Sequence, residues 1–589
     1  MTTFRSILLL SFLAPFALLL STPKEMMVPG FFADEAVYFC MIQSLAHDRD
    51  LAWTRQDLQR VCEIYPAGPV GVILKQLPSE KIVFAKLLTY PIAVVTFYIL
   101  FGVKGIVLFN LILMWIIIYL VAKHWNSTPG AALAGLAFMI FSAFFPYVLW
   151  CHPETLLSFL LTVFFWNWLR KDYQPTSLFS YFCVVCLGLA LTIKPPLLLL
   201  AIPAAVELIK KRVFKPFFVL LLTVVIIAAL THGCLGHLNP YEGNRRIFTD
   251  RFPLDAQENL FDRADSWSMS DAKFYFDTTT FLWNCLYFFI GRFSGILWYF
   301  FPGIALALLA ILSPSNSKGK WLISTISLFA LFLIIQIPSN YHGGGGALGN
   351  RYFVSLYPLL LLSAPRLPSK KTVVILVAIT AFFSGPFLVH PWLSSYQPGE
   401  FTRSGFYSRL PIEWTLVGAY PIFHPDLYHV TLPGLQGHWY FMDRQSSGKR
   451  DNGFYVQSGH SAQIMLELDE KQDFMDFSTS TDNYSAHASV RSQKAFTDFY
   501  VDPEKTHSVR VDLGTGHKKT DIYGRTRWIY HLRFLVAPSS STDNDITTKH
   551  LPVKVFFRAP VTDMPKHDHA SLSKKNSDHR HLFKRIMKM

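Results

Sequence analysis

The stretch GIVLFNLILMWIIIYLVA, residues 105–122, contains no charged residue and is long enough to cross a membrane. Runs of about 18 or more apolar residues are typical of membrane helices, since a rise of about 1.5 Å per residue then spans most of the hydrocarbon layer. The whole chain of 589 residues follows this trend, because 51% of its residues are hydrophobic and only 16% are charged. Globular chains carry about 25% charged residues. The composition therefore indicates a polytopic α-helical membrane protein.

Ten further apolar blocks predict, with this one, about eleven membrane-spanning helices. The other blocks are 6–22, 130–149, 155–169, 178–193, 196–209, 214–232, 296–313, 321–338, 351–365 and 372–390. The apolar stretch 82–101 is flanked or interrupted by Lys81, Lys86, Pro91 and Lys104, and is interpreted as an interfacial or re-entrant helix. The first block has no A-x-A-like cleavage site, so an uncleaved helix is favoured over a signal peptide.

Positive charge in the loops predicts the orientation. If residues 82–101 do not cross, the cytoplasmic loops include Arg170–Lys171, KKRVFK (210–215), SNSKGK (315–320) and RLPSKK (366–371), and all are basic. Cytoplasmic loops collect Lys and Arg, which also accounts first for the net charge of +14. The sequence thus predicts an inner-membrane protein with a cytoplasmic amino terminus. The loop 23–104 and the carboxyl-terminal region then lie on the outer, periplasmic side.

The composition changes to that of a soluble domain from about residue 400. Alternating runs such as AQIMLEL (462–468) and WIYHLRFLV (528–536), separated by turn residues, predict an antiparallel β-sandwich-like domain over residues 400–560. The chain then divides into a transmembrane domain, 1–392, this β-rich domain, and a basic tail, 561–589, predicted to be disordered.

The seven cysteines show no metal-finger spacing. Cys183 and Cys186 lie inside an apolar block and are interpreted as small buried hydrophobic residues. Cys40 and Cys62 share the first external loop, so a disulfide between them is left open.

Acidic residues occur where predicted helices meet the outer face. Asp34 and Glu35 follow the first span directly, and carboxylates near hydrocarbon are costly unless they are paired or functional. Reduced solvation also raises a carboxylate pKa, which suits a general base. An ordinary pair of interfacial acids is the alternative. Glu154 begins another helix, where an acid also stabilises the helix dipole, and the neighbouring His152 is interpreted as structural or as a hydrogen-bond partner.

Cations lie in the same predicted outer region. Lys194 stands alone between two apolar spans, where it either contacts an anion or extends its ammonium to the interface. Arg245 and Arg246 lie in a long external loop, and Arg351 follows GGGGALGN directly. Arginine forks bind phosphate oxygens at two points, and glycine allows the backbone to approach closely. Carboxylates and cations at one boundary suit a lipid that carries a phosphate and a sugar.

The order of these motifs resembles the GT-C superfamily of integral-membrane glycosyltransferases, which includes protein O-mannosyltransferases and the aminoarabinose transferase of lipid A. The resemblance covers about residues 1–392. The matched stretches are ADEAVYFCMIQSLA, YPAGPVGVILK, FGVKGIVLFNLILM, HPETLLSFLL, LALTIKPPLLLL and GNRYFVSLYPLLL.

The resemblance implies roles for individual residues. Asp34 matches the catalytic aspartate of the first loop, and Glu35 matches the adjacent acid. Glu154 stands where many relatives have an aspartate, which leaves its role in doubt. Lys194 matches a Lys-Pro position in substrate binding, and a further pair, Arg351 and Tyr352, matches the Arg-Tyr position. Some branches of the superfamily need a divalent cation and others do not, so metal use stays open.

The predicted activity is inverting transfer of a sugar from a polyprenyl-phosphate carrier to an acceptor hydroxyl on a glycan, lipid or protein. Asp34 is the predicted base, and Arg351, with Arg245 or Arg246, would stabilise the leaving phosphate. No nucleic-acid partner is expected. A non-enzymatic transporter or flippase of lipid-linked sugars is the alternative function, although paired internal repeats are not evident. A structural assembly factor is a third.

Overall fold

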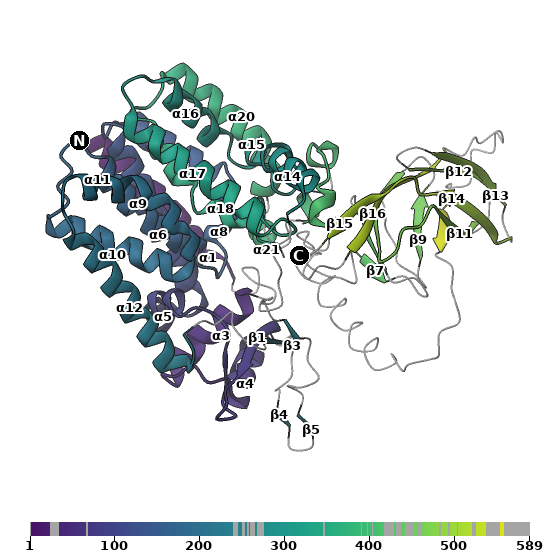
Figure 1. The fold of residues 1–589 in the computed structure, drawn as a ribbon, viewed down its shortest axis with the longest axis horizontal. Coiled ribbons are helices and arrows are strands. Elements are labelled where there is room, and N and C mark those ends of the chain that lie inside the picture. The colour runs from purple at the N-terminus through teal and green to yellow at the C-terminus, as the bar shows by residue number, and fades with distance from the viewer. Residues whose placement is uncertain are drawn as a thin grey trace. The chain divides into compact units, whose positions relative to one another are not determined.

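A computed structural model describes most of the chain. The described residues are 2–23, 34–65, 69–238, 245–249, 254–255, 258–259, 266–267, 276–344, 348–389, 391–396, 399–402, 405–417, 429–431, 437–441, 453–457, 461–481, 485–492, 495–502, 505–520, 526–537 and 554–558. The chain forms two compact units, one made of Met1–Phe423 and the other beginning at His424 (Figure 1). The predicted tail, 561–589, lies outside the described residues.

The first unit is helical. Its principal helices are α1 (Thr2–Ser21), α3 (Asp34–His47), α4 (Arg55–Ile64), α5 (Thr89–Phe101), α6 (Val103–His124), α7 (Pro129–Ile140), α8 (Phe144–Val148), α9 (Glu154–Leu169), α10 (Leu178–Ile193), α11 (Ile202–Lys210), α12 (Lys215–Leu235), α14 (Thr278–Ile290), α15 (Ile296–Tyr299), α16 (Phe301–Leu312), α17 (Ser317–Gln336), α18 (Arg351–Val354), α19 (Tyr357–Ser363) and α20 (Lys370–Leu388). Helix α6, which contains the opening stretch, packs against α1, α5, α7 and α9. It therefore lies inside the bundle.

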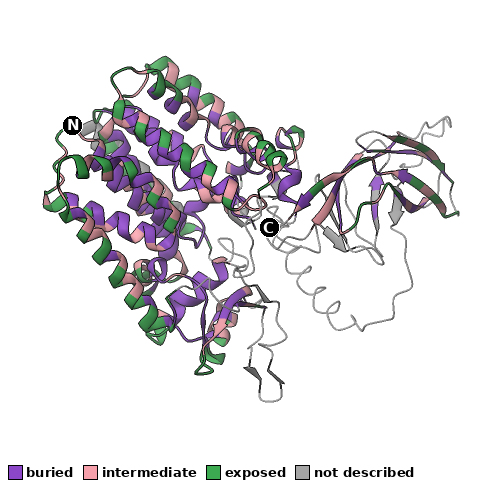
Figure 2. Ribbon diagram, in the orientation of Figure 1, coloured by how far each residue is buried: buried purple, intermediate pink, exposed green. Residues whose placement is uncertain are grey.

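Four of the described helices, α6, α12, α17 and α20, are long and apolar enough to cross a membrane. Helices α12 and α20 bury little of their apolar surface, and Figure 2 shows exposed residues along their outer faces. Phe218 on α12 is 69% exposed and Phe382 on α20 is 68% exposed. Such large apolar surfaces are stable in hydrocarbon rather than in water. The unit is thus a helical membrane domain.

Several predicted spans are interrupted. Residues 130–149 form α7 and α8, and residues 351–365 form α18 and α19. Residues 196–209 form a 3₁₀ turn, η1 (Pro195–Ala201), followed by α11, because two consecutive prolines lack backbone donors and break regular hydrogen bonding. The number of membrane crossings therefore stays a prediction.

Two segments differ from the sequence interpretation. The stretch 82–101 is not helical throughout, since Ile82–Phe84 form a strand and α5 begins only at Thr89. Its 13 helical residues would span about 20 Å, less than the hydrocarbon layer. Helix α14 lies in a region predicted to be an external loop. Its apolar run of 13 residues is too short to indicate a membrane span. Its amino-terminal end is capped by Asp277, which accepts a hydrogen bond from the Thr280 amide.

The segment between α1 and α5 and part of the segment between α12 and α14 form a small α/β layer. Its strands are β1 (Val70–Gln76), β2 (Ile82–Phe84), β3 (Arg245–Thr249) and β6 (Ser266–Trp267), in the order β2-β1-β3-β6. Antiparallel pairing of β1 with β3 joins two segments far apart in the sequence. Helix α4 begins with a capping box, in which Thr54 and Asp57 satisfy each other's backbone amides. Helix α3 packs on β1 and α5, which places the start of α3 beside the helical bundle.

The second unit is rich in antiparallel sheet, as predicted. One sheet has the order β13-β12-β16-β10-β8-β7, with β15 also paired to β16, and another has the order β14-β11-β17-β9. The strands are β7 (His429–Thr431), β8 (Gly437–Phe441), β9 (Gly453–Gln457), β10 (Ser461–Leu468), β11 (Phe474–Thr481), β12 (Ala486–Arg491), β13 (Phe496–Val501), β14 (His507–Asp512), β15 (His517–Thr520), β16 (Thr526–Val536) and β17 (Lys554–Arg558). Phe454 and Phe477 of the second sheet contact Phe534 of the first, so the two sheets share one hydrophobic core.

Candidate active site

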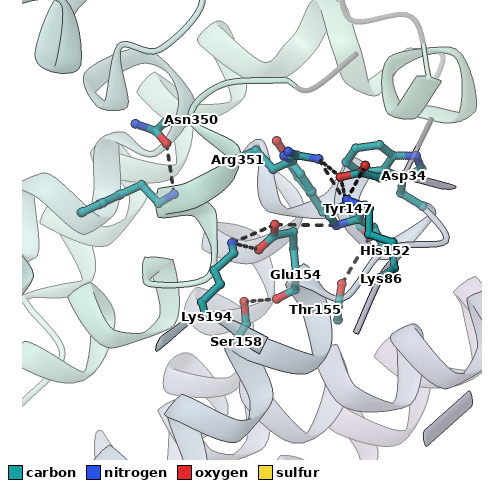
Figure 3. Close-up of polar contacts among 12 residues, drawn as sticks. Asp34, Lys86, Tyr147, His152, Glu154, Thr155, Ser158, Lys194, Asn350 and Arg351 are labelled. Carbon is teal, nitrogen blue, oxygen red and sulfur yellow. Dashed lines mark hydrogen bonds and ion pairs between the residues drawn. The ribbon is translucent and has the colours of Figure 1, made fainter. Parts of the chain in front are cut away.

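Asp34 is held between two cations that come from distant parts of the chain (Figure 3). Its Oδ1 lies 2.7 Å from the Lys86 Nζ, and its Oδ2 lies 3.0 Å from the Arg351 Nη1. Lys86 follows β2, whereas Arg351 begins α18. Burial by itself raises the pKa of Asp34, but Lys86, His152 and Arg351 together bring that pKa well below its usual range. The carboxyl group is therefore ionised at neutral pH.

His152 lies beside this pair and stacks on Trp150, with ring centroids 4.3 Å apart. Burial lowers the pKa of His152 to about 4, so the ring is neutral at pH 7. Its Nε2 lies 3.2 Å from the Arg351 Nη1, which is a donor only. A neutral ring that accepts there carries its proton on Nδ1, 3.6 Å from the Glu154 Oε1. His152 thus lies between the two carboxylates, 3.6 Å from each, without adding charge.

Glu154 and Lys194 form a second ion pair in the same cluster. The Lys194 Nζ lies 2.9 Å from Oε1 and 2.7 Å from Oε2 of Glu154, whose side chain is 1% exposed. The Lys194 ammonium also lies 5.1 Å from the ring centroid of Tyr352, and the Arg351 guanidinium lies 5.4 Å from the same ring. Tyr352 therefore contacts two of the cations through its aromatic face.

A glycine turn brings the backbone close to Arg351. Gly343 has φ of 91°, and a Cβ there would lie 2.9 Å from both the Cβ and the Nε of Arg351. The Arg351 amide also donates to the His342 carbonyl at 2.8 Å. Only glycine fits this position without displacing the guanidinium. Gly345 and Gly346 of the glycine run lie outside the described residues.

Glu35 is separated from Asp34 despite being its neighbour in sequence. Consecutive side chains on a helix point about 100° apart, and Glu35 is 1% exposed with its Oε1 3.4 Å from the Cys151 amide. Burial raises the pKa of Glu35 to about 8, although the nearby Trp150 indole and the hydrogen bond from the Cys151 amide oppose this rise. Glu35 is thus neutral at pH 7, and it contacts the loop that carries His152 through the Cys151 amide.

Two residues of the site were missed by sequence reasoning. Lys86 was interpreted only as an interruption of an apolar stretch, but it is 4% exposed and paired to Asp34. Asn110, the amide inside the opening stretch, donates through Nδ2 to the carbonyl of Val148 at 3.1 Å and to that of Trp150 at 2.9 Å. A single amide within an otherwise apolar run was the available signal for Asn110, since such groups must find partners within the bundle.

Arg245 and Arg246 lie on β3, where Arg246 pairs across the sheet with Leu74. Arg245 is 1% exposed. The described cations that pair with Asp34 are instead Lys86 and Arg351. A role for Arg245 or Arg246 in donor binding therefore stays a prediction. Arg251, from the same loop, lies outside the described residues.

Cations outnumber carboxylates in the described ion pairs of this cluster, where Lys86, Lys194 and Arg351 pair with Asp34 and Glu154. Three cations close together at the ends of apolar helices suit an anionic ligand, since buried charges are costly unless they are paired. Phosphate oxygens suit a guanidinium and an ammonium side by side.

Among the described residues, no group of three or more His, Cys, Asp or Glu side chains is arranged to hold a metal ion. Metal use stays open, as in the sequence interpretation. Cys40 and Cys62 are not joined to each other, so the disulfide left open for them is not formed in this structure. Cys183 and Cys186 are buried in α10, in keeping with a packing role.

Replacing Glu35 with glutamine is expected to reduce the loss of folding stability that occurs as pH rises to about 8. The unfolded glutamate ionises near pH 4.5, whereas the folded one retains its proton up to about pH 8. The folded state therefore binds more protons between these values, and wild-type stability falls as pH rises through this window. Glutamine has no proton to lose, so the variant should gain on the order of a few kcal/mol relative to wild type between pH 5 and pH 8.

The measurement is the thermal unfolding midpoint of the purified protein in detergent at both pH values. Asp172→Asn is the control, because that carboxylate is exposed, with 68% of its side chain accessible. An equal pH dependence in wild type and Glu35→Gln would contradict a buried, protonated Glu35.

Several solved structures resemble this chain. No family model matches the chain, and no curated protein matches it. The structure of ArnT from Cupriavidus metallidurans bound to undecaprenyl phosphate matches with 15% identity and a TM-score of 0.40, over 70% of this chain and 68% of that chain. The structure of the arabinosyltransferase EmbB from Mycobacterium smegmatis matches with 11% identity and a TM-score of 0.29, over 95% of this chain and 64% of that chain. Because both TM-scores are below 0.5, these likenesses assign neither a family nor a residue role to this chain.

Proposed function

We propose that this protein is an inverting glycosyltransferase that takes a sugar from a polyprenyl-phosphate donor. The observation that carries the proposal is the cluster of Lys86, Lys194 and Arg351 around two carboxylates, buried where apolar helices end. A lipid-linked phosphate would reach this cluster from the membrane, and the three cations would stabilise its charge. The acceptor is a hydroxyl of a glycan, lipid or protein on the outer face.

The proposed reaction is a single displacement. An acceptor hydroxyl oxygen attacks the anomeric carbon, and Asp34 takes its proton. The bond between the anomeric carbon and the phosphate oxygen breaks, and the polyprenyl phosphate leaves with the bonding electrons. Attack from the side opposite the phosphate inverts the anomeric configuration. Arg351 and Lys86 would stabilise charge that grows on the leaving oxygen.

The two cations also control the strength of Asp34 as a base. In the resting state Lys86 and Arg351 hold its pKa well below the usual range, although burial alone would raise it. A donor phosphate beside these cations would offset their attraction for the carboxylate and raise its pKa. Asp34 would thus become a competent base when the donor is bound. Glu35, neutral and buried, is proposed to position the loop that holds His152 rather than to take a proton.

A direct assay tests the activity. Purified protein in lipid is mixed with a labelled polyprenyl-phosphate sugar and with envelope extract as the source of acceptor. Transfer of label to an acceptor, with release of polyprenyl phosphate, is the expected result. Movement of the label across the bilayer without bond cleavage would favour the transporter instead. Mass spectrometry of envelope glycans from cells with and without the protein would identify the acceptor.

The proposed orientation places the amino terminus in the cytoplasm and the second unit in the periplasm. In a variant lacking the native cysteines, Ser315→Cys should be shielded from an impermeant thiol reagent in intact inner-membrane vesicles of right-side-out orientation. Ser485→Cys in the second unit should be labelled. Both serines are exposed in the structure, so access depends on the side of the membrane. Labelling of residue 315 but not of residue 485 would place the ion-pair cluster on the wrong side for a periplasmic reaction.

A further inference from the structure

A segment beyond the last long helix folds back onto a turn of the helical unit. Residues 405–417 follow α20, and the turn at 291–295 connects α14 to α15. The Arg292 amide donates to the Pro411 carbonyl at 3.0 Å, and its guanidinium donates to the Ser408 carbonyl. Backbone and side chain of one arginine thus hold the returning segment in place.

Glu413 closes the same contact from the other side. Its Oε1 accepts from the Phe293 amide at 2.8 Å, from the Ser294 amide at 2.9 Å and from the Ser294 hydroxyl at 3.0 Å. The Glu413 side chain is completely buried, at 0% exposure. A Cβ at Gly291 would lie 2.2 Å from this oxygen, so the turn leaves room only for glycine. Three donors converging on one oxygen fix the turn far more strictly than apolar packing would.

Hydrogen bonds continue from this turn to the loop that presents Arg351. The Ser294 hydroxyl lies 2.9 Å from the Tyr341 hydroxyl, and both groups are buried. Tyr341 directly precedes His342, whose carbonyl accepts from the Arg351 amide at 2.8 Å. The single proton of the Ser294 hydroxyl can go to Glu413 or to the Tyr287 carbonyl, 3.1 Å away, and in both cases the Tyr341 hydroxyl donates to Ser294. When the proton goes to Glu413, the chain of donors ends on the carboxylate.

A packing contact supports the other end of the same loop. The Tyr299 hydroxyl donates to the Arg292 carbonyl, and a Cβ at Gly349 would lie 3.1 Å from the Tyr299 ring. The loop before Arg351 is therefore seated on the 291–299 segment at both Tyr341 and Gly349. Displacement of that segment would move both described ends of the loop, at Tyr341 and at Gly349.

We propose that Glu413 is a positioning residue for the donor phosphate, because it fixes the turn that seats the Arg351 loop through Ser294 and Tyr341. The inference rests on the proposed function, in which Arg351 contacts that phosphate. Glu413 itself touches no reacting atom. Its effect is expected on donor affinity rather than on the rate of transfer at saturating donor.

The test compares Glu413→Ala, Glu413→Gln and Tyr341→Phe in the full-length protein. Two quantities are measured: hydrogen exchange of the peptide that covers residues 341–350, and the Kd for undecaprenyl phosphate in detergent. Glu413→Ala should speed exchange in this peptide and weaken binding by about tenfold, the equivalent of about 1.4 kcal/mol. Tyr341→Phe, which removes only the last hydroxyl of the chain, should change both in the same direction by less. Glu413→Gln keeps the accepting oxygen and should remain near wild type.

Gly291→Ala provides an independent variant, since its Cβ would displace the Glu413 carboxylate. It should reproduce Glu413→Ala, and the double variant should be no worse than either single one because both remove the same contact. Glu470→Ala, at an exposed position of the second unit, is the matched control.

Unchanged exchange of residues 341–350 in both Glu413→Ala and Tyr341→Phe would overturn the inference. Faster exchange with unchanged donor affinity would also overturn it, since the loop would then move without consequence for the phosphate. Failure of the proposed function is recognised separately, because wild type would then transfer no sugar whatever the loop does. A loss equal in Glu413→Gln and Glu413→Ala would contradict positioning through the accepting oxygen.

Discussion

Asp34→Asn is expected to lower sugar transfer by about 10²- to 10⁴-fold, the range typical of general base catalysis. Asparagine keeps the size of aspartate and one accepting oxygen, but it takes no proton at neutral pH. Lys86 and Arg351, which contact the two carboxylate oxygens at 2.7 and 3.0 Å, remain available to a donor phosphate. Donor binding should therefore be retained, or strengthened, because the cations lose an anionic competitor.

The assay is single-turnover transfer from a labelled polyprenyl-phosphate sugar, with donor affinity measured separately. Asp172→Asn is the control, since this exposed carboxylate pairs only with Arg170 in the described contacts. Thermal unfolding must accompany the assay, because neutralising Asp34 leaves buried cations less well paired. Near-normal transfer by Asp34→Asn would remove it from the mechanism, and Glu154 would be the next base to test. A transporter predicts no transfer by wild type and translocation that tolerates the asparagine.

Arg351→Lys is expected to weaken donor binding by about 1–3 kcal/mol, the range for a lost charge-assisted hydrogen bond. This free energy corresponds to an increase in Kd of about 5- to 150-fold. The guanidinium reaches Asp34 at 3.0 Å and His152 at 3.2 Å from the same nitrogen, and still presents other donors of its fork. A lysine ammonium is a compact charge that cannot reproduce this fork.

The measurement is the Kd for undecaprenyl phosphate, compared with kcat at saturating donor. Arg170→Lys is the control, because that arginine is 37% exposed and pairs with Asp172 on a loop predicted to be cytoplasmic. Retained charge with weakened binding is the expected signature of a two-point phosphate contact. Unchanged donor affinity in Arg351→Lys would reduce Arg351 to a residue that begins a helix and pairs with Asp34.

The sequence predicted most members of the ion-pair cluster but not their pairing. Asp34, His152, Glu154, Lys194 and Arg351 were all singled out, because charges next to apolar runs are rare and costly. Their contacts depend on how distant helices pack, which no local pattern contains. The structure shows that His152 lies between the two carboxylates and that Glu154 pairs with Lys194.

The adjacent acids show where local reasoning was insufficient. Asp34 and Glu35 were interpreted as a pair, yet one faces cations and the other is buried against Cys151. Their separation follows from helix geometry, and it becomes apparent only once α3 is known to begin at Asp34. Lys86 was missed for a related reason. It was grouped with an apolar stretch, whereas the structure places it between a strand and α5.

Helix formation itself was largely predictable, whereas helix ends and breaks were not. Apolar runs indicated α6, α12, α17 and α20 directly. Short helices such as α14 and α18 depend on tertiary partners, including the contacts of Arg292 with the 405–417 segment and of Arg351 with the His342 carbonyl. Isolated helices this short are marginal, so their sequences contain little independent signal.

Asn110 places two demands on one position of α6. Leucine there would make the run more hydrophobic and ease its insertion into the bilayer. It would also leave the carbonyls of Val148 and Trp150 without the donor that now holds them. The most membrane-like version of this helix is therefore not the version that builds the site, and efficient insertion and an ordered His152 loop are opposing requirements on a single side chain.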